Sequence, residues 1–213
     1  VLTRYIDADK RVLPTPALFD FGDCARFWKP AECLSFLHQY GALFSGNGAM
    51  YRTDKLRKAG GFAMALRSFC DGFRIQQLAL EFGVCIVPEV LASWRQQEKN
   101  YAARHRTDPA GAIAILEAVK VELVRLETPF PPAYAKRLLQ RLRFAAALAA
   151  VGSKPFDELV LRQSLDAYPP LIAELVELLA KIAGTVTAKI MLALLLRPFD
   201  ILLALQPRPT PVD

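Results

Sequence analysis

The spacing of apolar and polar positions changes near residue 100. Before that point, short apolar runs alternate with turn residues, and aromatic side chains cluster. After it, Ala and Leu dominate, and apolar residues recur every three or four positions, as on one face of a helix. We therefore expect an α/β portion over residues 1–100 and an all-helical extension over residues 101–213, with helix dominating overall.

The α/β portion predicts two helices followed by two strands. Residues 53–61 form a short helical pattern that a pair of glycines ends, and residues 70–82 form a longer one that Gly83 ends. The run "VCIV" predicts a buried strand, with Cys85 as a buried thiol. After Pro88, the run "VLASWR" predicts another strand.

The second half predicts a series of helices. Asp108 followed by Pro109 is a helix start signal, and the sequence "TPFPP" at residues 128–132 breaks the chain. The next helix is expected to direct Leu138, Leu139 and Leu142 to a core. Its basic side chains should lie away from them, namely Lys136, Arg137, Arg141 and Arg143. Further helices are predicted near residues 156–166, 170–183 and 186–205.

Composition narrows the possible chemistry. A hydrophobic content of 53% excludes a disordered chain, and the formal charge of +6 is a mild excess. Four cysteines and two histidines show no zinc-ligand spacing, so we expect reduced thiols and a cytoplasmic location. No run reaches the ~18 apolar residues of a membrane helix. Contact of residues 186–205 with the inner membrane face is a second interpretation.

Two acidic residues near the start leave two interpretations open. Asp7 and Asp9 in "YIDADKRV" have the spacing of a metal-binding Asp-x-Asp pair. The polar residues that follow favour a hairpin with its turn at residues 7–10. On the hairpin interpretation, the chain shows no metal ligands.

Residues 41–95 carry a likeness to a known family. They read "GALFSGNGAMYRTDKLRKAGGFAMALRSFCDGFRIQQLALEFGVCIVPEVLASWR". Five features follow one another in order. They are the segment "SGNGAMYR", a helix that ends in "GGF", an acidic residue at the start of a second helix, a strand with the pattern "G-x-x-x-x-V-P-E", and a strand that ends in Arg. This arrangement resembles the second half of a family-2 glycosyltransferase catalytic domain with the GT-A fold.

The resemblance implies a role for Asp71. In inverting members, the acidic residue at this place is the general base that takes the proton of the acceptor hydroxyl. The family often has two acidic residues in a row, and here Cys70 replaces the first. The alternative is that Asp71 serves only as a helix N-cap, a common use of Asp.

Five further residues are candidates for substrate binding. Small residues and an amide, as in Ser45, Gly46 and Asn47, allow the backbone to approach an acceptor or a diphosphate closely. A tight turn is the alternative for this segment. Trp94 can stack on a sugar ring and Arg95 can bind phosphate. A structural anchor and a surface ion pair are their respective alternatives.

The resemblance also implies partners. A full enzyme would use a nucleotide-sugar donor, a sugar or glycan acceptor, and a divalent cation, Mg²⁺ or Mn²⁺, whose ligands are not evident in this chain. The donor-binding half normally precedes the matched segment, so this chain is expected to be part of a longer protein, inactive by itself and able to self-associate through an uncovered sheet edge.

A non-catalytic helical module is the alternative function. Its basic face, formed by Lys136, Arg137, Arg141 and Arg143, would meet anionic lipid or nucleic acid. The absence of interleaved aromatic residues disfavours nucleic acid.

Overall fold

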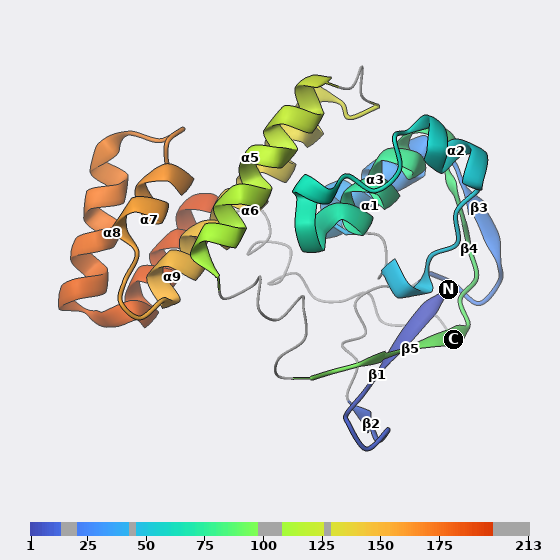
Figure 1. Cartoon of the computed structure of the whole chain (residues 1–213), viewed down its shortest axis with the longest axis horizontal. Helices are drawn as coiled ribbons and strands as arrows, with labels where there is room; N and C mark the ends of the chain where they lie inside the picture. The colour runs from blue at the N-terminus through green and yellow to red at the C-terminus, as the bar shows by residue number, and fades with distance from the viewer. Residues whose placement is uncertain (14–20, 43–45, 98–107, 126–128, 198–213) are drawn as a thin grey trace. The chain divides into compact units, whose positions relative to one another are not determined.

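A computed structural model describes residues 1–13, 21–42, 46–97, 108–125 and 129–197. The chain divides into two compact units, one made of Val1–His105 and Glu117–Ala135 and the other of Arg106–Leu116 and Lys136–Asp213. The first unit thus contains the helical residues 117–125 and 132–135 in addition to the expected α/β portion. Helices dominate the described residues, as the apolar spacing predicts (Figure 1).

A small mixed sheet lies in the first unit. Strand β1 (Leu2–Ile6) is central, with β2 (Val12–Leu13) antiparallel on one side and β5 (Val90–Arg95) parallel on the other (Figure 1). Strands β3 (Arg26–Trp28) and β4 (Val84–Ile86) form a separate antiparallel pair. Both strands predicted after residue 83 are therefore confirmed.

The acidic segment between β1 and β2 is a hairpin turn, as the second interpretation predicts. The Asp7 amide donates to the Arg11 carbonyl at 3.0 Å, and the Lys10 amide donates to the Asp7 carbonyl at 3.2 Å. The Asp7 carboxylate accepts the Arg11 amide at 2.8 Å. Lys10 has a left-handed φ of 67°, which the tight turn requires. The Asp7 side chain therefore serves the turn.

Three helices and two 3₁₀ segments lie between the strands of this unit. The helices are α1 (Pro30–Tyr40), α2 (Thr53–Lys58) and α3 (Cys70–Phe82), and the 3₁₀ segments are η1 (Gly46–Gly48) and η2 (Met64–Phe69). The sequence analysis does not predict α1. Its start uses Pro30 and a Glu32 carboxylate that accepts the Lys29 amide at 2.8 Å, and its end uses Gly41 at φ 81°. Helices α1 and α3 pack together.

The end of α3 depends on Gly83. This residue has a φ of 76°, and a Cβ at its position would lie 2.4 Å from the Trp28 carbonyl oxygen. The close approach lets the chain enter β4 beside β3. Cys85 then shares a ladder position with Phe27, and both side chains are exposed. The prediction of a buried Cys85 is wrong, because no described element covers this face of the strand pair; Cys33 on α1 is the buried thiol.

From residue 109 onward the described elements are all helices, and α5 and α6 are each divided between the two units. Helix α5 (Pro109–Arg125) begins where the Asp-Pro signal predicts, and α6 (Pro132–Gly152) begins at the end of the predicted break. Helices α7 (Glu158–Ser164), α8 (Pro170–Ile182) and α9 (Gly184–Leu196) follow, close to the predicted positions. Residues 198–205 of the last predicted helix lie outside the described residues. None of the described helices is both long and apolar enough to cross a bilayer.

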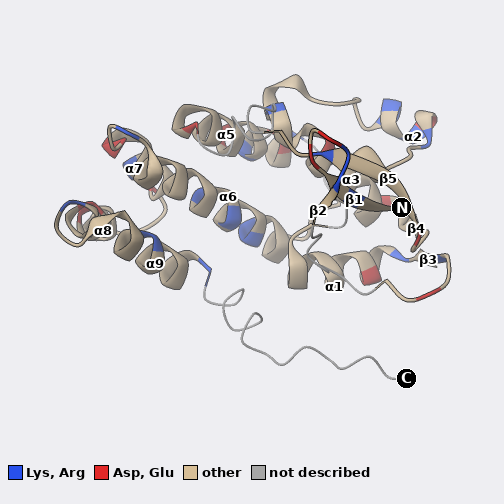
Figure 2. Ribbon diagram, turned by 90° about the horizontal axis from the view of Figure 1, so that it is seen from below, with Lys and Arg blue, Asp and Glu red and all other residues tan. Residues whose placement is uncertain are grey.

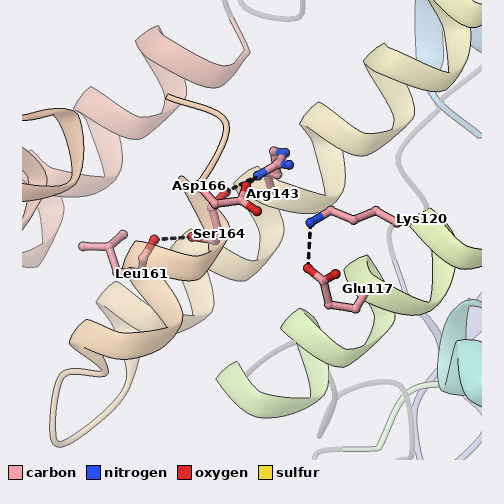
Figure 3. Close-up of polar contacts among 6 residues, drawn as sticks. All are labelled: Glu117, Lys120, Arg143, Leu161, Ser164 and Asp166. Atoms are coloured by element: carbon pink, nitrogen blue, oxygen red, sulfur yellow. Dashed lines mark hydrogen bonds and ion pairs between the residues drawn. The ribbon is translucent and has the colours of Figure 1, made fainter. Parts of the chain in front are cut away.

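The predicted basic face of α6 is wrong at Arg143. This residue is 9% exposed, and its guanidinium donates to the Ser164 carbonyl at 3.2 Å and pairs with the Asp166 carboxylate (Figure 3). Arg143 stands four residues after Leu139 and four before the buried Ala147, so it belongs to the core side of the helix. Leu138 is buried as predicted, whereas Leu139 and Leu142 are half-buried.

Candidate functional site

Asp71 lies in the first turn of α3, at its second helical residue. The helix N-cap is Phe69, so the N-cap interpretation of Asp71 is wrong. Asp71 Oδ1 accepts the amide of Gly72 at 2.6 Å. The carboxylate is half-buried and lies at the N-terminal, positive end of the dipole of a 13-residue helix.

The other carboxylate oxygen, Oδ2, lies against the backbone of Gly46. A Cβ at Gly46 would lie 1.8 Å from Asp71 Oδ2 and 2.7 Å from Asp71 Cγ. A side chain at this position would therefore require the Asp71 carboxylate to move. Gly46 is therefore the residue that allows η1 to approach the start of α3, and the two candidates Gly46 and Asp71 are brought together.

The rest of η1 is attached to the sheet. The Asn47 amide donates to the Ser93 carbonyl on β5 at 3.4 Å, and its Oδ1 accepts the Thr3 hydroxyl on β1 at 3.4 Å. A Cβ at Gly48 would lie 2.7 Å from the Val1 carbonyl oxygen. Asn47 thus ties two parallel strands to the segment beside Asp71. Ser45 lies outside the described residues.

Trp94 and Arg95 occupy the last two positions of β5, pairing with Tyr5 and Ile6 on β1. The Trp94 ring packs edge-on against Tyr5, with centroids 5.4 Å apart and planes at 84°. Because successive strand residues alternate between faces, Trp94 and Arg95 point to opposite sides of the sheet. The Arg95 side chain is exposed. No described contact joins either residue to Asp71.

Tyr51 is a neighbour of Asp71 that the sequence analysis misses. Burial, together with the negative charges of Asp71 and Cys70, raises the pKa of Tyr51 to about 12. Its hydroxyl is buried and has no hydrogen-bond partner among the described residues. Burial and the Asp71 charge likewise raise the pKa of the Cys70 thiol. Tyr51 and Cys70 therefore stay protonated at neutral pH beside the Asp71 side chain. The only sequence signal for Tyr51 is its place inside the segment "SGNGAMYR".

The segment before α3 is strained. Arg67 has φ 48° and ψ −127°, a left-handed conformation that favours glycine. Such a conformation costs ~1–3 kcal/mol and is frequent at functional sites. It fixes the direction in which the chain enters α3, only a few residues before Asp71.

A row of buried polar groups holds α3 in place. The Arg74 guanidinium is fully buried and donates through Nη1 to Gln77 Oε1, and the Tyr134 hydroxyl donates to Gln76 Oε1 at 2.8 Å. Burial lowers the pKa of Arg74, and the charge of Glu122 opposes that shift. Since each of these contacts is deep in the core, the helix that carries Asp71 has little freedom to move.

A cavity of about 630 Å³ lies along α3. Tyr51 contributes to its wall, with the α3 residues Ile75, Leu78 and Phe82. Lys55 also lines it, with its ammonium 4.5 Å from the centroid of the Phe82 ring. The cavity is thus mainly apolar with a cationic group at one side. Asp71 does not line it, although Tyr51 adjoins both.

Comparisons with protein-family models, curated proteins and solved structures find no match for this chain. Within the described part of the chain, no three His, Cys, Asp or Glu side chains are grouped to hold a metal ion. Function is therefore inferred from the residues of this chain alone.

Replacing Gly46 by Ala tests the contact with Asp71. We expect Gly46→Ala to lower the free energy of unfolding by ~1–3 kcal/mol, because the added methyl overpacks against the carboxylate. In an Asp71→Ala background, the same change should cost less than half as much, because the obstructing oxygen is gone. Urea unfolding of the four proteins in this double-mutant cycle measures the coupling. Equal costs in both backgrounds would show that the two residues do not touch.

The pH titration of Tyr51 tests the electrostatics. Its pKa of about 12 exceeds the ordinary 10.0, so the stability it contributes is present below pH 10 and is lost as pH rises toward 12. Absorbance near 295 nm should show one of the six tyrosines titrating late, and Tyr51→Phe should remove that step. Asp71→Asn should lower the pKa of Tyr51, because a nearby negative charge is removed. An unchanged late step in Asp71→Asn would place Asp71 elsewhere.

Proposed function

We propose that this chain is the acceptor-side part of an inverting glycosyltransferase in which Asp71 is the general base. The observation that carries the proposal is a half-buried carboxylate fixed by Gly46 and by the start of α3. Among the described residues, no Lys or Arg forms an ion pair with it. A carboxylate that is held in place and not neutralised is suited to accept a proton.

The proposed reaction is a single displacement. The acceptor hydroxyl gives its proton to the Asp71 carboxylate, and its oxygen forms a bond to the anomeric carbon of the donor sugar. The bond from that carbon to the diphosphate oxygen breaks on the opposite face, and the nucleoside diphosphate leaves with the bonding electrons. The configuration at the anomeric carbon is thereby inverted.

The order of elements around the site supports this proposal. In the GT-A resemblance, a short helix, an acidic residue at the start of a second helix and two strands follow one another, and α2, α3, β4 and β5 do so here. Gly46 and Asn47 are proposed to form the wall near the acceptor. Trp94 and Arg95, at the end of β5, are proposed for sugar and phosphate contact.

Donor binding is assigned to the rest of the enzyme. The proposal includes a nucleotide-sugar donor, a sugar or glycan acceptor and Mg²⁺ or Mn²⁺ on the diphosphate. The described residues do not provide a site for such a cation. The Asp7 carboxylate is bonded within the hairpin turn, and no three metal-ligating side chains are grouped elsewhere among these residues.

The exposed thiols of Cys24 and Cys85 suit a reducing compartment such as the cytoplasm. The alternative basic interaction face loses support with the burial of Arg143.

Replacing Asp71 by Asn tests the proposed base. In the whole protein that carries this chain, screened against a panel of nucleotide sugars, Asp71→Asn should reduce turnover by ~10²–10⁴-fold. The free energy of unfolding should change little, because an amide oxygen can still accept the Gly72 amide.

The matched control for that variant is Asp54→Asn. Asp54 is an exposed carboxylate on α2 that pairs with Arg52 at 3.0 Å. Asp54→Asn should keep turnover within about twofold of the wild type, as expected of an exposed surface pair. Wild-type turnover in Asp71→Asn would exclude Asp71 as the base.

A further inference from the structure

Helix α8 carries an apolar stripe that the described residues of its own unit leave exposed. Leu171, Leu175, Leu178 and Ile182 are 37–76% exposed. The opposite side of the same helix buries Ala173 and Val176 in a core shared with α9. The exposed stripe is therefore additional to the face that folds the unit.

The neighbouring helix α9 also exposes apolar side chains. On α9, the exposed apolar side chains are Val186, Ile190 and Leu194. Lys189 is the sole charged residue within the bounds of α9, which is drawn almost entirely in tan in Figure 2. Across the two helices, seven aliphatic side chains are exposed, most of them by more than half. Apolar patches above a few hundred Å² mark interaction sites, and a standard interface takes about 800 Å² from each partner.

The spacing along α8 is that of a helix-pairing seam. The exposed apolar residues follow one another at intervals of four, three and four, which is the a/d pattern of two helices packed at a shallow angle. A flat lipid surface does not require this alternation. The stripe also lacks the aromatic residues that are common at membrane interfaces.

The charged residues beside the stripe are complementary to those of a second copy of the same helix. Glu174 and Lys181 flank the same edge of the seam, seven residues apart and on either side of its centre, and both are exposed. If two α8 helices pair antiparallel about a twofold axis through that centre, Glu174 faces the partner subunit's Lys181. The reverse pair forms on the other side of the axis, as in any isologous interface.

Lys181 can take part in this contact without giving up its present ones. Its ammonium is 2.8 Å from Glu158 and 2.7 Å from Glu177 within the same unit. An ammonium has three donors, so one remains for the partner subunit. Glu174 has no described ion pair in its own subunit.

We propose that the chain forms a homodimer through antiparallel pairing of α8 with α8 of a second copy. The dimer buries the Leu171, Leu175, Leu178 and Ile182 stripe of both subunits and forms two Glu174–Lys181 contacts across the axis. This interface uses no residue of the candidate site and is independent of the proposed enzymatic function.

Light scattering coupled to size exclusion, with sedimentation equilibrium for the dissociation constant, tests the dimer. The wild-type chain should show about twice the monomer mass of 23.7 kDa at micromolar concentration. Leu178→Lys should weaken dimerisation at least tenfold, because a charge replaces an apolar seam residue. Leu159→Lys is the matched control, since Leu159 on α7 is 66% exposed but lies off the seam, and it should leave the mass unchanged.

A charge-swap mixture tests the antiparallel orientation. Glu174→Lys alone and Lys181→Glu alone should each weaken dimerisation several-fold, because each places like charges across the axis. Mixed in equal amounts, the two variants should form a heterodimer with near wild-type affinity. A monomeric wild type, including one that instead binds vesicles of anionic phospholipid, would overturn the proposal. So would a Leu159→Lys effect equal to that of Leu178→Lys, or a mixture no tighter than the single variants.

Discussion

The described first unit is organised around the contact of the Asp71 carboxylate with the bare backbone of Gly46. Because Gly46 has no Cβ, η1 can lie directly against the start of α3 without displacing the Asp71 carboxylate. Asn47 then binds Ser93 on β5 and Thr3 on β1, so the same turn links the helix to both parallel strands. The position of Asp71 relative to the sheet therefore follows from two neighbouring residues.

Elements with strong local signals could be predicted from the sequence. Residues 53–58, α3 and the two strands after Gly83 are bounded by Gly and Pro, whose backbone preferences act locally. Helix α1 could not be predicted as easily, because its start uses Lys29 and Glu32 in place of the usual Ser or Thr cap. The environments of Cys85 and Arg143 depend on tertiary neighbours, which apolar spacing does not encode.

The candidate site shows the same division between local and tertiary information. The segments that carry the resemblance identify Asp71, Gly46 and Asn47 as candidate site residues. In the structure, Gly46 lies next to the Asp71 carboxylate. The buried hydroxyl of Tyr51 and the raised pKa values of Tyr51 and Cys70 depend on how η1 and α3 pack, so they appear only in three dimensions. Trp94 and Arg95 remain candidates on a strand end without a direct contact to the carboxylate.

The stereochemistry of the first product tests the central claim most directly. A single displacement assisted by one fixed carboxylate inverts the anomeric centre, whereas a covalent intermediate would lead to retention. Proton NMR of the product formed early by the whole protein, with a nucleotide sugar that it accepts, reads the configuration from the coupling of the anomeric proton. The account predicts a configuration opposite to that of the donor. A product with the donor's own configuration would contradict Asp71 as a general base.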